Sequence, residues 1–235
     1  MIEGIEAIAF DIDGTLYPNR SFYWRIVPFL LRHWRFLAEF GRVRREIRVW
    51  QAAHPGETHA DFLGWQAELL ARRLGVTPSV ARSLADRLIY EGWRPVFERV
   101  RPFPGVREAF VAFGAAGLPV GILSDFLPSQ KGSIWGLDAL SDVILGSEET
   151  GALKPSAVPF VALAGALGVA PDRILYVGNS VASDVVGASA AGMKTACVIS
   201  PLRAFLLKLT RAPRLATGAD ISFTSYRKLV RDVLK

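Results

Sequence analysis

The sequence has little cysteine and histidine, and this excludes several kinds of active site. It contains one cysteine, Cys197, and three histidines, none of which follows His59. A single cysteine excludes a disulfide within the chain and is typical of a reduced, cytosolic protein. A nucleophilic cysteine needs a histidine partner, and His33, His54 and His59 match no zinc-ligand spacing. The sequence therefore argues against cysteine catalysis and against a zinc centre.

Long hydrophobic runs are also absent. The longest stretches without a charged side chain are residues 109–124 and 155–171, and both contain glycine or proline. Both are too short to span a bilayer, so we interpret them as buried elements of an α/β fold. The first residues, MIEGIE, are acidic, so we expect no secretory signal or transit peptide and a cytoplasmic location.

Lysine is absent before Lys131, and arginine carries the positive charge of that part of the chain. The formal net charge is +6, and between residues 17 and 104 there are 15 arginines against 8 acidic residues. A basic surface of this kind suits an anionic partner such as phosphate, nucleic acid or acidic lipid. We favour the interpretation that most of these arginines lie on solvated helix faces, and we expect no nucleic-acid partner.

Residues 7–16, AIAFDIDGTL, contain a short apolar run followed by two carboxylates. We predict that the run is a buried strand and that Asp11 and Asp13 lie just past its end. Residues two apart in a strand point to the same face, so the two carboxylates can converge. Such a pair needs a cation or a shared proton, and oxygen ligands favour Mg²⁺. Gly14 permits a sharp turn and Thr15 adds a hydroxyl donor, although an ordinary Asp-Gly turn would have the same sequence.

Other polar residues lie next to further apolar or helical segments. They are Ser124 after the run 118–123, Lys154 before a helical stretch at 156–167, and Asn179, Ser180 and Asp184 after the run 174–177. Ligands of parallel sheets bind beyond the carboxyl ends of the strands, so we expect these residues to share one site.

The order of segments predicts an α/β protein with an insertion. From residue 105 onward, apolar strands alternate with helical segments, which predicts a Rossmann-like parallel sheet with helices on both faces. The sequence thus predicts a core at residues 1–16 and 104–235, with an all-helical domain inserted at 17–103.

Within the insertion, helical spacing and turn signals predict several helices. Pro28 limits where a first helix can start. Residues 62–74 predict a second helix, and residues 80–90 predict a third that Thr77 or Ser79 caps.

The motif residues suit phosphoryl transfer. A carboxylate such as Asp11 can attack phosphorus and form an aspartyl phosphate. Asp13 can protonate the leaving oxygen and later deprotonate the attacking water. Catalysis is then mostly positioning and charge stabilisation, for which Lys154 supplies a positive charge and Ser124 a hydroxyl donor. Taken alone, Lys154 could equally be a surface lysine and Ser124 a helix N-cap.

In chain order the motifs are Asp-x-Asp-x-Thr, Ser, Lys-Pro and Gly-Asn-Ser-x-x-x-Asp. Over nearly its whole length the sequence resembles the haloacid dehalogenase-like (HAD) hydrolase superfamily, in its phosphatase branch with a helical (C1-type) cap. The resemblance implies the catalytic roles given above, and it implies that the inserted helices close over the site. It also implies phosphate binding by Thr15, Ser124 and Lys154, and Mg²⁺ binding by Asp11, the Asp13 carbonyl, Asn179 and Asp184.

One position departs from the family pattern. The fourth motif usually opens with Gly-Asp, and here Asn179 follows Gly178. An amide oxygen can still bind Mg²⁺, but one negative charge is lost, while Asp184 keeps a carboxylate nearby. We expect weaker Mg²⁺ binding in a phosphomonoester hydrolase that acts on a small phosphorylated metabolite.

Three other functions are compared with this one. A haloacid dehalogenase would use the same aspartate without Mg²⁺, but it typically lacks the second aspartate, which is present here as Asp13. A phosphonate-cleaving relative needs a lysine in the cap, where this chain has none. A non-catalytic phosphate-binding or interaction protein is the alternative from a different functional class.

Residues 201–214 are not explained by the family resemblance. An apolar stripe at helical spacing comprises Leu202, Phe205, Leu206 and Leu209, and the basic residues around it are Arg203, Lys208, Arg211 and Arg214. We favour a helix that packs its apolar stripe on the sheet edge. The alternative is an interfacial helix on anionic lipid, together with the aromatic, arginine-rich stretch 20–48.

Overall fold

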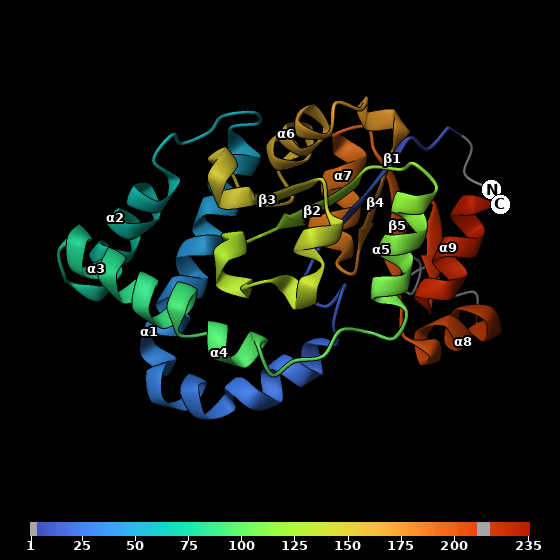
Figure 1. Cartoon of the computed structure of the whole chain (residues 1–235). Helices are drawn as coiled ribbons and strands as arrows, with labels where there is room; N and C mark the ends of the chain where they lie inside the picture. The colour runs from blue at the N-terminus through green and yellow to red at the C-terminus, as the bar shows by residue number, and fades with distance from the viewer. Residues whose placement is uncertain (1–3, 211–216) are drawn as a thin grey trace.

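The computed structural model describes residues 4–210 and 217–235. In these residues six parallel strands form one sheet in the order β3-β2-β1-β4-β5-β6. The strand β1 comes first along the chain but lies in the middle of the sheet, between β2 and β4 (Figure 1). Because the strand order reverses at this point, the carboxyl edge beside β1 is where such a sheet binds its ligands. The expected α/β class and Rossmann-like core are confirmed.

The strands are β1 (Ala7–Phe10), β2 (Val120–Ser124), β3 (Val143–Gly146), β4 (Ile174–Gly178), β5 (Lys194–Val198) and β6 (Ile221–Phe223). The α-helices of the described residues are α1 (Asn19–Ala53), α2 (Phe62–Leu74), α3 (Pro78–Ala85), α4 (Arg94–Phe97), α5 (Val106–Ala115), α6 (Ala157–Leu167), α7 (Val186–Ala190), α8 (Pro201–Thr210) and α9 (Tyr226–Leu234). Short 3-10 turns and two π-helical turns, Asp86–Glu91 and Val181–Val185, complete the described elements.

Apolar side chains cover both faces of the sheet. On one face, Phe10 of β1 stacks on Phe110 of α5 with the ring centroids 4.7 Å apart, and α9 adds Tyr226. On the other face, Phe160 of α6 packs edge-on against Tyr176 of β4. Burial on both sides explains why the strands are continuous apolar runs rather than alternating sequences.

The helices α1 to α4 lie between β1 and α5 along the chain, and we call residues 17–103 the helical insert. The second half of α1 packs on α2 and α3 through an apolar cluster that includes Phe40, Ile47 and Leu70. Figure 1 shows the insert beside the sheet, with α3 at its far end. Leu153 belongs to the same cluster, so the insert packs against the residue that precedes Lys154.

The helices of the insert match the sequence prediction in part. Helix α2 has the expected bounds, and Thr77 caps α3 by accepting a hydrogen bond from the backbone N–H of Val80. Pro28 does not set the start of the first helix, which begins at Asn19 and continues through the proline. The helical dihedral angles break five residues after the proline, at His33. The sequence prediction missed α4 and β6, which are only four and three residues long.

Helix α8 contradicts the packing expected for its apolar stripe. Ala204 and Leu207 pack on the small apolar cluster around Cys197. The exposed side chains are Leu202, Phe205 and Leu209, while Leu206 is half-buried. The expectation of a stripe packed on the sheet edge is therefore wrong for the three exposed residues. Arg211 and Arg214 lie outside the described residues.

Within residues 4–210 and 217–235, no helix has both the length and the apolar character needed to cross a membrane.

The stacked pair of Phe10 and Phe110 gives a first prediction. Phe110→Ala removes a fully buried ring, and we expect it to lower the free energy of unfolding by about 3–5 kcal/mol. Chemical denaturation followed by circular dichroism measures this change. The matched control is Val111→Ala on the exposed side of the same helix, for which we expect a change within about 0.5 kcal/mol. Equal effects of the two substitutions would contradict the placement of α5.

Candidate active site

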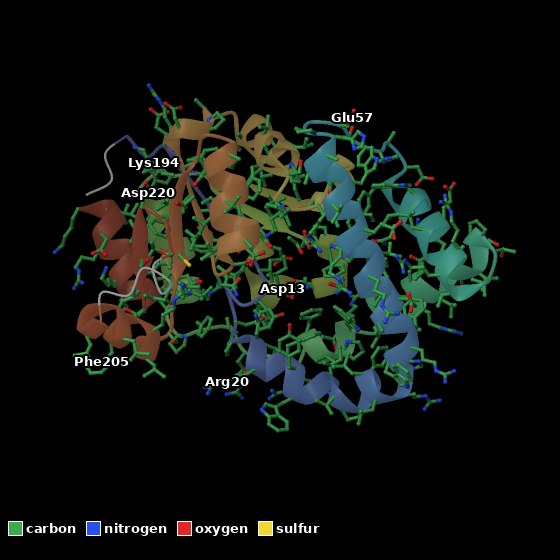
Figure 2. All side chains as sticks on the ribbon, turned by 180° about the vertical axis from the view of Figure 1, so that it is seen from behind. Asp13, Arg20, Glu57, Lys194, Phe205 and Asp220 are labelled. Atoms are coloured by element: carbon green, nitrogen blue, oxygen red, sulfur yellow. The ribbon has the colours of Figure 1, made fainter. Side chains whose placement is uncertain are left out.

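The expected site residues gather at the carboxyl edge of the central strands. Asp11 follows β1, Ser124 ends β2 and Asn179 follows β4. Strand β1 pairs with β2 on one side and with β4 on the other, so these residues meet although they are far apart in the sequence. Figure 2 shows Asp13 between the sheet and the helical insert.

Lys154 lies at the centre of this site. Its Nζ is 2.6 Å from Asp11 Oδ1 and 2.8 Å from Asp184 Oδ1, and it donates to the hydroxyl of Tyr176 at 3.2 Å. Burial lowers the pKa of the Lys154 ammonium, but the two carboxylates outweigh this effect and raise the pKa well above its usual value. Lys154 is therefore a buried, permanent positive charge and not a surface lysine.

Asp184 orients both Lys154 and the loop after β4. Its Oδ2 accepts hydrogen bonds from the backbone N–H groups of Asn179 and Ser180, at 3.1 and 3.0 Å. A Cβ on Gly178 would lie 2.3 Å from the Asp184 Cβ, so this close approach requires glycine. Both carboxylate oxygens of Asp184 thus have partners within the protein, and its role as a metal ligand stays a prediction.

Asp11 is a buried carboxylate whose charge is only partly compensated. Burial, and next the negative charge of Asp184, raise the pKa of the Asp11 carboxyl to about 7, although Lys154 lowers it. The hydroxyl of Thr15 donates to the other oxygen, Oδ2, at 2.8 Å. A further cation close to Oδ2 would lower this pKa and keep the carboxylate ionised.

Asp13 has two partners that the sequence prediction missed. The hydroxyl of Tyr17 donates to Asp13 Oδ1 at 2.5 Å, and Lys131 Nζ lies 2.9 Å from Oδ2. Lys131 is buried against Phe97, whose ring centre is 3.9 Å from Nζ. Burial lowers the pKa of Lys131, while Asp13 opposes this change. Asp13 is therefore held by two donors that reach it from different segments.

The residues around Thr15 fit a hard divalent cation. The Thr15 hydroxyl lies 2.8 Å from Asp11 Oδ2 and 3.4 Å from Asn179 Oδ1, so these two oxygens face the same point. In the described part of the chain, no three histidine, cysteine, aspartate or glutamate side chains are grouped to hold a metal ion. Mg²⁺ nevertheless takes few protein ligands and keeps several waters, which suits one carboxylate, one amide and the Asp13 carbonyl.

Ser124 is fully buried at the end of β2. Its Oγ accepts a hydrogen bond from the backbone N–H of Phe126 at 3.2 Å, and its carbonyl accepts one from the Ser147 hydroxyl at 3.1 Å. The first contact is a local turn interaction and not a helix cap, because the next helical turn begins at Pro128 with Leu127 before it. The role of Ser124 in phosphate binding stays a prediction.

Two arginines of the helical insert reach the site. Arg44 is buried and pairs with Asp125 at 2.9 Å and with Glu148. Arg48 pairs with Asp125 at 2.5 Å, and its Nε donates to the backbone carbonyl of Lys154 at 2.9 Å. The interpretation of the arginines as solvated helix faces is wrong for these two, because they join the insert to the sheet.

A cavity of about 690 Å³ adjoins the site. Its walls include Gly14 and Asn179 from the site, Arg20 from α1, and Arg203 from α8. Gly14 has a φ of +81°, and a Cβ there would lie 2.3 Å from Asn179 Nδ2. Glycine is thus required both by the backbone conformation and by the approach of the Asn179 amide.

The thiol of Cys197 donates to the backbone carbonyl of Asn179 at 3.8 Å. Cys197 is a free, buried cysteine that packs under α8. Burial raises the pKa of its thiol to about 11, although Arg203 lowers it, so the thiol stays protonated at neutral pH. The sequence expectation that catalysis does not use cysteine agrees with this environment.

Comparison with known protein families identifies the chain. The model of a hydrolase family described as haloacid dehalogenase-like hydrolase matches residues 5–192. The chain is a haloacid dehalogenase-like hydrolase. The match extends from before β1 to the end of α7, so this family membership covers all four motifs.

Similar curated proteins of this hydrolase family carry phosphatase names. The chain is 34% identical over 207 residues to a phosphoglycolate phosphatase of Thiobacillus denitrificans, and the aligned region covers 83% of each chain. It is 28% identical over 206 residues to a glyceraldehyde 3-phosphate phosphatase of Methanopyrus kandleri, and the aligned region covers 81% of this chain and 82% of that protein.

Solved structures show the same fold. The L-2-haloacid dehalogenase of Xanthobacter autotrophicus, determined with chloropropionic acid covalently bound, superposes with a TM-score of 0.63 over 98% of each chain. Its sequence identity to this hydrolase is 23%, so the likeness concerns the fold alone.

The ion pairs of Asp125 give a prediction about pH. Burial raises the pKa of the Asp125 carboxyl, but Arg44 and Arg48 outweigh it and lower the pKa to about 2. Since this is below the pKa of the unfolded chain, the pairs stabilise the fold above pH ~4 and lose this effect as the pH falls towards 2. We expect Asp125→Asn to lower the free energy of unfolding by about 2 kcal/mol at pH 7.

Urea denaturation of wild type and variant across pH 2–7 tests this pH dependence. We expect the difference between them to shrink below pH ~4. The exposed carboxylate Asp172 offers the matched control, and Asp172→Asn should change stability by less than about 0.5 kcal/mol. A difference for Asp125→Asn that stays constant with pH would contradict the ion-pair interpretation.

Proposed function

We propose that this hydrolase is a Mg²⁺-dependent phosphatase that cleaves the phosphate monoester of a small phosphorylated metabolite through an aspartyl phosphate. The observation that carries the proposal is the position of Asp11, buried and fixed by Lys154 at the carboxyl edge of the sheet. Asp13 follows two residues later with its own donors, Tyr17 and Lys131. The phosphatase names of the curated relatives support the same reaction.

The proposed reaction has two displacement steps at phosphorus. In the first, a carboxylate oxygen of Asp11 forms a bond to phosphorus while the bond to the leaving oxygen breaks, and Asp13 gives that oxygen a proton. In the second, Asp13 takes a proton from water, and the water oxygen displaces Asp11 from phosphorus. The products are the alcohol and inorganic phosphate, and Asp13 regains its proton for the next cycle.

The remaining residues supply charge and orientation. Lys154 offsets the negative charge that collects on the phosphoryl oxygens, and the hydroxyls of Thr15 and Ser124 supply donors at the same edge. The residues that would hold Mg²⁺ are Asp11, the Asp13 carbonyl and Asn179, with Asp184 nearby. Bound there, the ion would reduce the repulsion between the Asp11 carboxylate and the phosphate.

We propose that residues 17–103 act as a helical cap over a core of residues 1–16 and 104–235. The ion pairs of Arg44 and Arg48 with Asp125 support this division, because they join the insert to the sheet beside the site. Since Asp11 is almost completely buried, a substrate reaches it only when these contacts allow entry.

The two alternatives give different results in the same assays. A haloacid dehalogenase would release halide from a 2-haloacid without Mg²⁺. Its leaving halide needs no proton, so Asp13, with its donors Tyr17 and Lys131, would have no role in that reaction. A non-catalytic phosphate-binding protein would bind inorganic phosphate but turn over no substrate. A panel of phosphorylated metabolites and one 2-haloacid, each with and without Mg²⁺, separates the three functions.

The nucleophile gives the central prediction. Asp11→Asn keeps the shape of the side chain but removes the attacking charge, so we expect kcat to fall by at least ~10³-fold. Phosphate release from the best metabolite of the panel measures it, and Asp172→Asn serves as the remote control with unchanged kcat. Activity of Asp11→Asn close to wild type would overturn the mechanism.

Asn179 gives a prediction about the metal. Asn179→Asp restores a carboxylate beside Asp11, and we expect the apparent Mg²⁺ affinity to increase about tenfold. Titration of activity with Mg²⁺ measures the change. Ser83→Asp is the control, because it adds the same charge at an exposed position of α3, at the far end of the helical insert and away from the site. An unchanged Mg²⁺ titration for Asn179→Asp would assign the ligand role to Asp184 instead.

A further inference from the structure

The first half of α1 exposes large apolar side chains on one side. Trp24 is 79% exposed and Leu31 is 71% exposed, and Tyr23, Val27 and Trp34 are also exposed. Before the break at His33, Val27 lies three or four residues from each of Tyr23, Trp24 and Leu31, so these four side chains share one face of the helix, away from the buried Phe22 and Ile26. Among the described residues, folding therefore leaves most of this face exposed to solvent.

Helix α8 exposes a second apolar stripe. Leu202, Phe205 and Leu209 are 67%, 61% and 68% exposed, again at helical spacing. Ala204 and Leu207, on the other side of the helix, make the contact with the core. Single exposed apolar residues are ordinary, but two helices that each expose a row of them mark an interaction surface.

The two rows lie on the same side of the molecule. Figure 1 and Figure 2 both show α8 and the first half of α1 along its lower edge, and Figure 2 labels Phe205 and Arg20 there. Pro18, Asn19 and Arg20 line the same cavity as Pro201 and Arg203, so the start of α1 and the start of α8 are neighbours. We call the exposed apolar residues of these two helices, with the arginines between them, the α1–α8 surface.

The α1–α8 surface is basic. The exposed arginines of the first half of α1 are Arg20, Arg25, Arg32 and Arg35. The sequence contains no aspartate or glutamate from residue 14 to 38, or from residue 185 to 219. The positive charge is therefore not balanced by acidic residues in either segment.

This combination discriminates between possible partners. A second copy of the chain, docked through the same surface, would bring arginines against arginines with no acidic residue of these segments between them. A nucleic acid would match the charge, but it offers no partner for the aliphatic Leu31, Leu202 and Leu209. An anionic bilayer matches both features, since its headgroups attract arginine and its acyl region takes leucine, phenylalanine and tryptophan.

We propose that the α1–α8 surface docks this protein on anionic lipid bilayers. Arginine side chains contact the headgroups, and Trp24, Leu31 and Phe205 enter the boundary between headgroups and acyl chains. The cavity beside the site, which Arg20 and Arg203 line, then faces the membrane surface. This docking is independent of the proposed reaction, and a catalytically inactive protein would show it equally.

Flotation with liposomes tests the proposal. The full-length protein is mixed with vesicles of phosphatidylcholine alone or of equal parts phosphatidylcholine and phosphatidylglycerol, at low and at high salt. We expect binding to the anionic vesicles only, and weaker binding at high salt because salt screens the charges. The double variant W24S/F205S should bind at least about tenfold more weakly, since it loses two buried apolar side chains.

The double variant V111S/V161S is the matched control. It removes two exposed valines from α5 and α6, outside the α1–α8 surface, and should bind as wild type does. Circular dichroism and activity on a soluble substrate should be the same for all three proteins.

Three results would overturn the proposal. The first is absence of binding to anionic vesicles at low salt, and the second is equal binding to neutral vesicles. The third is a concentration-dependent dimer in sedimentation that W24S/F205S abolishes, because the surface would then be an interface between copies of the chain.

Discussion

The site depends on one buried ammonium group. Lys154 lies between the carboxylates of Asp11 and Asp184. Lys154 precedes α6, Asp11 directly follows β1, and Asp184 lies in the π-helical turn after β4. None of the three charges is solvated, so each is tolerated only because the others are present. Removing one partner leaves an uncompensated buried charge, which typically costs about 3–5 kcal/mol. The geometry of Asp11 and the stability of the sheet edge therefore depend on the same contacts.

A second set of charges joins the helical insert to this edge. Arg44 and Arg48 come from the middle of α1, and both pair with Asp125 immediately after β2. Arg48 also binds the backbone carbonyl of Lys154, so the insert contacts the central lysine directly. The position of the insert and the shape of the site are consequently linked through hydrogen bonds to the same few residues.

Sequence reasoning predicted the parts of this site that follow from strand ends. Asp11, Ser124 and Asn179 each come directly at or after an apolar run, and parallel strands place such residues together. Lys131 was missed because its contact with Asp13 arises from tertiary packing. Tyr17 was missed although it lies only four residues after Asp13, because the two residues are in an irregular segment where spacing does not predict a contact. Arg44 carried a signal that was overlooked, since it follows the buried Phe40 by four residues and so lies on the apolar side of α1.

Tyr17 connects the insert to the chemistry in a further way. It lies between β1 and α1, where the chain leaves the sheet, and its phenol hydrogen-bonds to Asp13. A rotation of the insert about this junction would shift the phenol relative to the carboxylate. In the mechanism we propose, the position of Asp13 for proton transfer would therefore depend on the position of the insert. A substrate that arrived before the insert closed would meet Asp11 in position but Asp13 without its contact to Tyr17.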